Sequence, residues 1–157
     1  CAIEGIGPAK ATQVQASLEL GRRLMEQGAD VRPRISSPAE AARLFSSKMQ
    51  YLDQEEMHVM LLDTRNQCMR TETVYRGNVN SSMIRIAELF RPAIKDNAPQ
   101  IILAHNHPSG EVTPSADDIQ VTRDAVRAGE LLDIAVLDHL IIGTHAFLSM
   151  KERGLGF

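Results

Sequence analysis

The sequence predicts an α/β fold of the α+β type, in which a mixed β-sheet lies between helices in three layers. From residue 36 onward, stretches with helical apolar periodicity alternate with short β-type runs in the order αββαβαβ, followed by one further strand. The chain has 157 residues, of which 43% are hydrophobic and 24% are charged. This size and composition are typical of one globular domain with a small appendage and exclude a disordered or fibrous chain.

The first 28 residues are predicted to form a segment of their own. Gly5, Gly7 and Pro8 precede a stretch of helical periodicity, and proline is favoured in the first helical turn because its missing N–H costs nothing there. We expect this helix to end at Gly28. Residues 29–35 show no periodicity and indicate a linker, so the main domain is predicted over residues 36–157. Because the chain begins with cysteine instead of methionine, we expect it to be a fragment.

The elements of the main domain follow from local patterns. Helical periodicity predicts helices over residues 38–49, 84–94 and 115–132. β-type runs predict strands over residues 58–62, 73–75 and 101–104, and two or three more strands from the runs 134–137, 140–142 and 146–149. Ser37 with Pro38 is a typical helix start, and Ser81 and Ser82 are the expected caps of the second helix. The polar residues 63–67 favour a turn between antiparallel strands.

Charge, hydropathy and cysteine usage limit the function classes. The net charge of −3 does not indicate a basic surface that would bind nucleic acid, so any DNA contact must be local. Apolar runs fall far short of the roughly 20 residues that cross a bilayer, and no membrane contact is expected. The two cysteines, Cys1 and Cys68, suggest neither a disulfide framework nor a cysteine zinc site, and we expect a cytoplasmic protein.

One segment carries residues suited to a metal. His105 and His107 follow a buried strand, and alternate residues of an extended chain point to the same side, so both imidazoles can reach one ion. Asp118, in the first turn of the next helix, can supply a third ligand and leave a fourth position to water, as in catalytic zinc sites. Two alternatives stay open: an HxH pair is often fortuitous, and Ser115 with Asp118 can form a capping box that needs no metal.

The whole string resembles a known motif. His105 and His107, then seven residues, Ser115, two residues and Asp118 match the JAMM motif of the JAB/MPN metalloprotease superfamily. Further short segments resemble those of the bacterial RadC family: Tyr75-Arg76-Gly77, Asn80-Ser81-Ser82, Ala104-His105-Asn106-His107-Pro108-Ser109-Gly110, Val121-Thr122-Arg123, Leu137-Asp138-His139 and Glu152-Arg153-Gly154-Leu155. The resemblance runs from about Ile35 to the C-terminus. It departs at Arg85-Ile86, where many relatives have His-Pro after Asn-Ser-Ser, outside the metal motif.

The resemblance implies a JAB/MPN fold with one zinc ion per chain, held by His105, His107 and Asp118. It also implies a glutamate at the start of the first strand that activates water; of Glu55 and Glu56, Glu56 fits the family pattern better. A carboxylate there could take a proton from water and pass it to a leaving amine. The serine of the motif, Ser115, would hydrogen-bond to the developing oxyanion. The implied function is a zinc-dependent hydrolase that cleaves a peptide or isopeptide amide in a peptide or protein substrate.

A rival prediction, from the family's traditional name, is a protein of DNA repair or recombination whose metal site is structural or acts on nucleic acid. The acidic residues Glu111, Asp117 and Asp124 near the motif favour the hydrolase. A purely structural zinc domain is a third possibility that would require a fourth protein ligand.

The N-terminal glycines resemble the end of a helix-hairpin-helix segment, in which backbone N–H groups bind DNA phosphates. Gly5, Gly7 and Lys10 are the candidate contacts, and a helix-entry turn is the alternative. Weak DNA binding at best is therefore expected.

The remaining histidines are not predicted to be ligands. His58 is expected to be structural, His145 to be solvated, and His139 to form a supporting pair with Asp138.

Overall fold

The computed structural model describes residues 7–27, 32–77 and 84–157 of the chain. The chain divides into two units, Cys1–Arg32 and Pro33–Phe157, and the division falls inside the predicted linker. Helix α1 (Pro8–Gln27) belongs to the first unit and confirms the predicted N-terminal helix. Within the described residues, no helix combines the length and the apolar character that a bilayer span requires.

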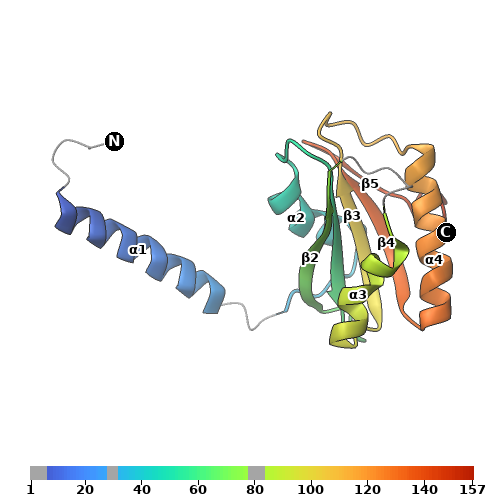
Figure 1. The fold of residues 1–157 in the computed structure, drawn as a ribbon, viewed down its shortest axis with the longest axis horizontal. Coiled ribbons are helices and arrows are strands. Elements are labelled where there is room, and N and C mark those ends of the chain that lie inside the picture. Colours follow the sequence, from blue (N-terminus) through green and yellow to red (C-terminus); the bar gives the residue numbers. More distant parts are fainter. Residues whose placement is uncertain (1–6, 28–31, 78–83) are drawn as a thin grey trace. The chain divides into compact units, whose positions relative to one another are not determined.

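The second unit is built on a five-stranded mixed sheet with the order β2-β1-β3-β4-β5 (Figure 1). Its strands are β1 (Glu56–Leu62), β2 (Cys68–Arg76), β3 (Gln100–Asn106), β4 (Ala135–Ile142) and β5 (Phe147–Ser149). Strands β3 and β4 are parallel, and the other neighbours are antiparallel. A helical connection joins β3 to β4, as parallel strands require.

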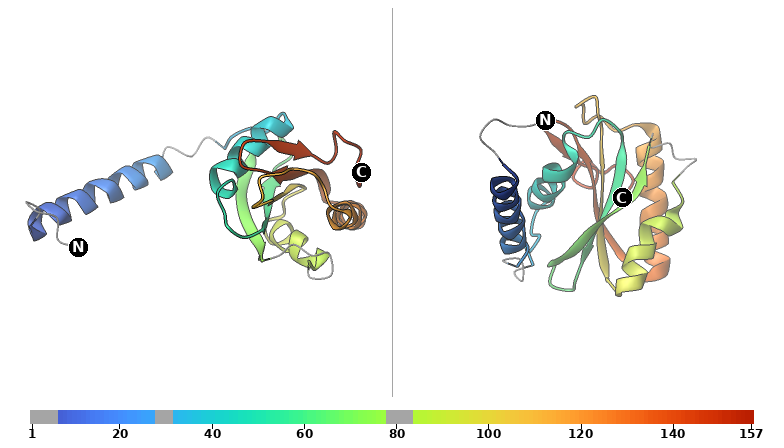
Figure 2. Two further views of the ribbon diagram at one scale, coloured as in Figure 1. Left: turned by 90° about the horizontal axis from the view of Figure 1, so that it is seen from above. Right: turned by 60° about the vertical axis from the view of Figure 1, so that its left-hand side comes forward.

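Helices cover both faces of this sheet, which confirms the predicted three-layer arrangement. Helix α2 (Pro38–Met49) lies on one face, and α3 (Ile86–Asp96) and α4 (Ala116–Leu132) lie on the other (Figures 1 and 2). Side chains of a strand alternate between faces, so β1 contributes to two separate cores. Met60 packs with Phe45 of α2, whereas Met57 packs with Phe90 of α3.

Two strands differ most from their predicted bounds. Strand β4 is continuous through Asp138 and His139, where the sequence predicted a break between two strands. Both polar side chains are buried but have hydrogen-bond partners, so the strand accommodates them. Strand β2 spans nine residues where only 73–75 were predicted, because its half-buried polar positions conceal the strand pattern.

The start of α3 also differs from the prediction. Its N-cap is Arg85, whose side chain makes no capping hydrogen bond, and the helix begins at Ile86. The predicted caps, Ser81 and Ser82, lie outside the described residues. The exposed Arg85 guanidinium lies 3.8 Å from the carboxylate of Glu88, one helical turn along.

Candidate metal centre

The end of β3 places two imidazoles side by side. His105 lies within the strand and His107 follows it directly, and their Nε2 atoms are 3.1 Å apart. The loop after the strand is closed by the Gly110 N–H, which donates to the His107 carbonyl, and His107 Nδ1 lies 2.8 Å from the carbonyl oxygen of Glu111. Because that carbonyl only accepts, a neutral His107 carries its proton on Nδ1 and presents an Nε2 lone pair.

Asp118 completes a triad with these two histidines. Its Oδ1 lies 3.1 Å from His105 Nε2, and its Oδ2 lies 3.7 Å from His107 Nε2. Ligand atoms 2.0–2.1 Å from one zinc ion at tetrahedral angles lie roughly 3.3 Å apart. The distances from His105 Nε2 to His107 Nε2 and to Asp118 Oδ1 are close to this value, and one ligand atom from each of the three residues lies within 4.8 Å of the others, so the three could hold a single ion. Among the described residues, these three are the group of ligand-type side chains that converge in this way.

The triad is sheltered but not closed. The side chains of His105 and Asp118 are 0% and 4% exposed, whereas that of His107 is 15% exposed. Solvent therefore reaches the triad on the His107 side. Three converging ligand-type side chains with one accessible side could hold a metal ion and leave a coordination position open on that side.

Electrostatic interactions within the triad favour the charged carboxylate. Burial opposes ionisation of Asp118, but the adjacent imidazoles of His105 and His107 in their protonated forms, together with the Ser115 hydroxyl, donate to the carboxylate; they outweigh burial and hold the pKa of Asp118 well below its usual range. The hydrogen bond to Asp118 raises the pKa of His107 against the effect of burial, and the charge of Glu55 adds to the rise. Asp118 is therefore ready to bind a cation, and His107 must release any extra proton first.

Ser115 caps α4 and holds Asp118. Its side chain accepts from the Asp118 N–H at 3.1 Å, and its own N–H and O–H both donate to Asp118 Oδ2 at 2.7 Å. The predicted capping box is thus confirmed. Since Oδ2 receives both donors, the carboxylate is fixed with Oδ1 toward His105.

Glu56 does not face the triad. Met57 lies opposite His105 in the β1–β3 pair and shares its face of the sheet, so Glu56, one residue earlier, points to the other face. There its Oε2 lies 2.8 Å from His58 Nε2, and its Oε1 lies 3.2 Å from Arg76 Nε. Glu56 therefore does not lie beside the triad, where the sequence analysis expected it. His58 is buried, as expected of a structural residue.

Glu55 is the glutamate whose charge reaches the triad. Glu55 directly precedes β1 and is two residues before Met57, which shares a face with His105, and the charge of Glu55 contributes to the raised pKa of His107. The Gly77 N–H donates to the Glu55 carbonyl at 2.9 Å, which ties the backbone at this point to the end of β2. A one-residue shift in the sequence alignment separates this residue from the predicted one.

The predicted pair of Asp138 and His139 does not form between side chains, because neighbours in a strand point to opposite faces. His139 lies on the triad's face, with Nε2 2.8 Å from His105 Nδ1. Asp138 lies on the α2 face and accepts from Ser149 Oγ at 2.7 Å. The alternation along residues 138–142 is the signal that would have separated them.

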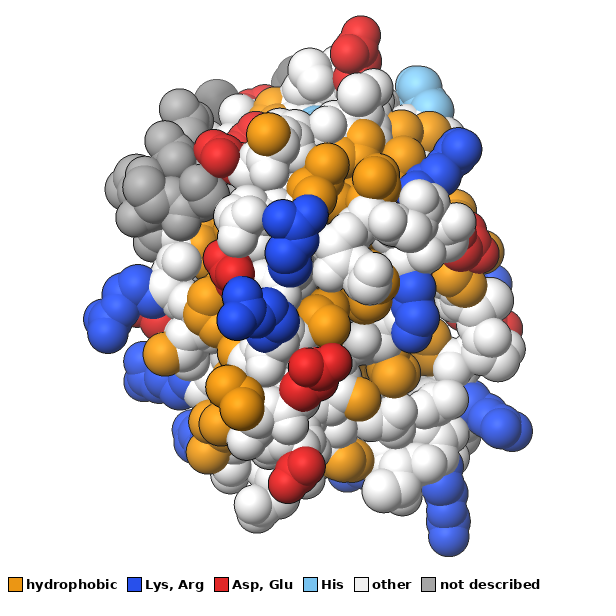
Figure 3. All heavy atoms as spheres, turned by 90° about the vertical axis from the view of Figure 1, so that its right-hand side faces the viewer, with side chains coloured by type: hydrophobic (Ala, Val, Ile, Leu, Met, Phe, Trp, Pro, Cys, Tyr) orange, Lys and Arg blue, Asp and Glu red, His pale blue; other side chains and the backbone are white. Residues whose placement is uncertain are grey.

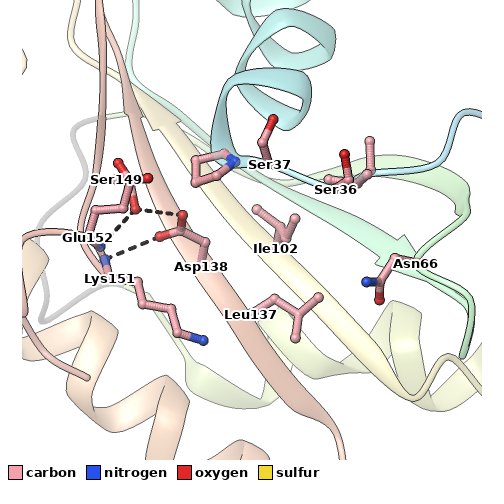
Figure 4. A pocket seen from close by; sticks show the side chains of 11 residues that line it. Ser36, Ser37, Asn66, Ile102, Leu137, Asp138, Ser149, Lys151 and Glu152 are labelled. Carbon is pink, nitrogen blue, oxygen red and sulfur yellow. Dashed lines mark hydrogen bonds between the residues drawn. The ribbon is translucent and has the colours of Figure 1, made fainter.

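Asp138 lines a hollow of about 400 Å³ on the α2 face (Figure 4). Ile102 and Leu137 supply apolar walls, and Ser37 at the start of α2 lies at the rim. Burial raises the pKa of Asp138 against its hydrogen bonds from Ser149 and the Lys151 N–H. This hollow is separated from the triad by the sheet.

The candidate DNA contacts are only partly described. Gly5 lies outside the described residues, whereas Gly7 and Lys10 lie at the start of α1. In the second unit, Figure 3 shows the face that carries α4, where Lys and Arg side chains lie among acidic and hydrophobic ones. That mixture is typical of a solvated surface.

The sequence profile of the RadC-like JAB domain matches residues 35–155. The chain belongs to this family. The matched region contains the triad, both glutamates and Ser115, but leaves out α1. The predicted family membership and the JAB-type fold of the main domain are thereby confirmed.

Proteins of similar sequence align with nearly the whole chain. A "UPF0758 protein" of Roseiflexus sp. (strain RS-1) is 52% identical over 153 residues, which are 98% of this chain and 66% of the relative. A "UPF0758 protein" of Chloroflexus aurantiacus is 50% identical over 157 residues, 100% of this chain and 69% of the relative. One from Desulforamulus reducens is 46% identical over 153 residues, 98% and 67% of the two chains. The chain thus spans about two thirds of the length of these relatives.

Proposed function

We propose that this chain is a zinc-dependent hydrolase that cleaves a peptide or isopeptide amide with an activated water molecule. The observation that carries the proposal is the convergence of His105, His107 and Asp118 at the spacing of zinc ligands, with solvent access on one side. Two nitrogens and a carboxylate oxygen are a donor set that zinc prefers. Membership of a JAB-domain family supports the same chemistry.

The catalytic roles follow from position. Zinc bound by the triad would polarise the scissile carbonyl and lower the pKa of water to about 7. The Glu55 carboxylate would accept a proton from the attacking water and deliver it to the leaving nitrogen, so that one water and one amide yield a carboxylate and an amine. Glu55 takes the place of Glu56 in this assignment because only Glu55 shares the face of the triad.

Ser115 would act as the donor to the developing oxyanion. Its hydroxyl proton now serves Asp118 Oδ2, which also receives the Ser115 N–H. The carboxylate therefore keeps one hydrogen bond when the hydroxyl turns toward substrate. A preorganised donor of this kind lowers the barrier by stabilising charge that appears only in the transition state.

Elemental analysis and a cleavage screen test the proposal together. Purified protein should contain about one zinc per chain and cleave members of a peptide library that includes lysine ε-linked amides. His107→Ala and Asp118→Asn should lose zinc and cleavage together, since two remaining strong ligands hold the ion poorly. His145→Ala, which changes an exposed histidine outside the triad, is the matched control. Equal zinc content in His107→Ala and wild type would refute the assigned site.

A further inference from the structure

A chain of buried hydrogen-bonding groups runs behind the triad. His139 of β4 is fully buried, with its Nε2 2.8 Å from His105 Nδ1 and its Nδ1 2.6 Å from Thr122 Oγ1. Thr122 Oγ1 in turn lies 2.6 Å from the carbonyl oxygen of Asp118. These hydrogen bonds connect the side chain of His105 to the backbone of Asp118 through His139 and Thr122, which do not belong to the triad.

The direction of each hydrogen bond in this chain follows from one contact. A carbonyl oxygen has no proton, so the 2.6 Å contact between the oxygens of Thr122 and Asp118 requires the hydroxyl proton between them. Thr122 Oγ1 has then used its only proton and must accept from His139 Nδ1. A neutral His139 therefore has its lone pair on Nε2, and His105 Nδ1 must donate to it.

The opposite direction is unfavourable. If His105 carried its proton on Nε2, its Nδ1 would accept from His139, and Thr122 would have to donate to His139 Nδ1. The oxygens of Thr122 and Asp118 would then face each other at 2.6 Å without a proton. A buried contact of that kind is repulsive and loses a hydrogen bond, which costs more inside a protein than at its surface.

We propose that Thr122 and His139 are positioning residues that set the tautomer of His105, so that its Nε2 lone pair points toward the metal position. The inference rests on the proposed metal site and adds its supporting residues. It also explains why α4 provides more than the ligand Asp118: the next turn of the same helix supplies the hydroxyl that fixes the opposite histidine. Hydrogen-bond partners of this kind typically change metal affinity by 10–100-fold.

The tautomer is measurable without any metal or substrate. Long-range ¹H–¹⁵N correlation spectra of ¹⁵N-histidine-labelled protein, assigned with His105→Gln, distinguish protonated from unprotonated ring nitrogens. At a pH where both rings are neutral, metal-free wild type should show His105 and His139 both protonated on Nδ1 and bare on Nε2. Neutral His105 protonated on Nε2 in the folded wild-type protein would overturn the inference.

Two variants of one residue test the consequence. Thr122→Val is nearly isosteric but lacks the hydroxyl, and it should shift His105 toward the other tautomer and weaken zinc binding about 10–100-fold in competition with a chromophoric chelator. Thr122→Ser keeps the hydroxyl and should restore both wild-type values. Equal zinc affinity and an unchanged His105 tautomer in Thr122→Val would refute the inference. Failure of wild type to bind zinc would instead refute the proposed function, and the tautomer spectrum would still decide this inference.

Discussion

Replacing each of the two neighbouring glutamates by glutamine separates a catalytic position from a structural one. Glu55→Gln retains the size of the side chain and removes its ability to accept a proton from water. One positioned acid/base group contributes about 10²–10⁴-fold to a rate, so kcat/KM for amide cleavage should fall by that factor. Zinc content should persist, because Glu55 is not one of the converging ligands.

Glu56→Gln is the matched control, and its cost can be worked out from the contacts. The variant loses the charge paired with Arg76, whose side chain is 72% exposed, while an amide can still hydrogen-bond to His58. Such a solvent-screened ion pair contributes about 0–1 kcal/mol, which for a chain of this size shifts Tm by no more than about 4 °C. Cleavage should therefore stay near wild type.

The assay compares zinc-loaded wild type and both variants on one substrate, with metal content and Tm measured on the same samples. Full activity of Glu55→Gln together with loss in Glu56→Gln would contradict the assignment of faces in β1. Full activity in both would refute general-base catalysis by either glutamate.

Three further predictions use other parts of the molecule. In metal-free protein, the hydrogen bond to Asp118 raises the pKa of His107, so the pairing of these two residues stabilises the fold at pH values below the ordinary pKa of 6.5 and is lost as pH rises through the raised pKa. The free energy of unfolding in urea should therefore fall as pH increases above 6.5. A flat or rising profile would contradict this prediction. Gly156 has a positive φ, and a Cβ added there would lie 2.8 Å from Thr122 Cβ, so Gly156→Ala should lower the free energy of unfolding by about 1–3 kcal/mol. Gly154 also has a positive φ but no atom near its added Cβ, so Gly154→Ala should cost less. Equal losses in the two variants would show that the contact with Thr122 does not matter. Duplex DNA should bind weakly at physiological salt in fluorescence anisotropy, because the net charge is −3, and nanomolar affinity that survives removal of residues 1–28 would support a DNA-directed role.

The predictable parts of the site were those fixed by local spacing. His105 and His107 alternate at the end of an apolar strand, and Ser115 with Asp118 has the spacing of a capping box, so both pairs could be placed from sequence. Each pair depends only on the geometry of one element. The two pairs come together only because of the loop between them, and the sequence indicated that they meet only through its resemblance to the JAMM motif.

The glutamate could not be placed reliably because a strand has a side-chain period of two. Shifting the start of β1 by one residue moves every side chain to the other face, and both Glu55 and Glu56 precede the same apolar run. Only the pairing of Met57 with His105 determines which carboxylate shares the triad's face. Pairing between strands 48 residues apart in sequence leaves no local signal.

The sequence analysis assigned His139 the wrong partner for a related reason. A polar pair, Asp138 and His139, in a short apolar run is typical of a turn, and the sequence accordingly predicted a break. In the structure each side chain finds a partner on its own face of the sheet, so the strand continues. Burial of both residues therefore depends on groups supplied by α4 and by the segment after β4.

The capping box and the metal site, which the sequence presents as alternatives, are compatible in three dimensions. A carboxylate has two oxygens, and in Asp118 the N–H and O–H of Ser115 both bind Oδ2. Oδ1 is left 3.1 Å from His105 Nε2, held in place by the same hydrogen bonds that satisfy the helix N-terminus. The cap thus prevents rotation of the side chain and lowers the entropy that a metal ligand would otherwise lose on binding. A helix start that is stable without metal is therefore evidence for a preorganised ligand and not evidence against one.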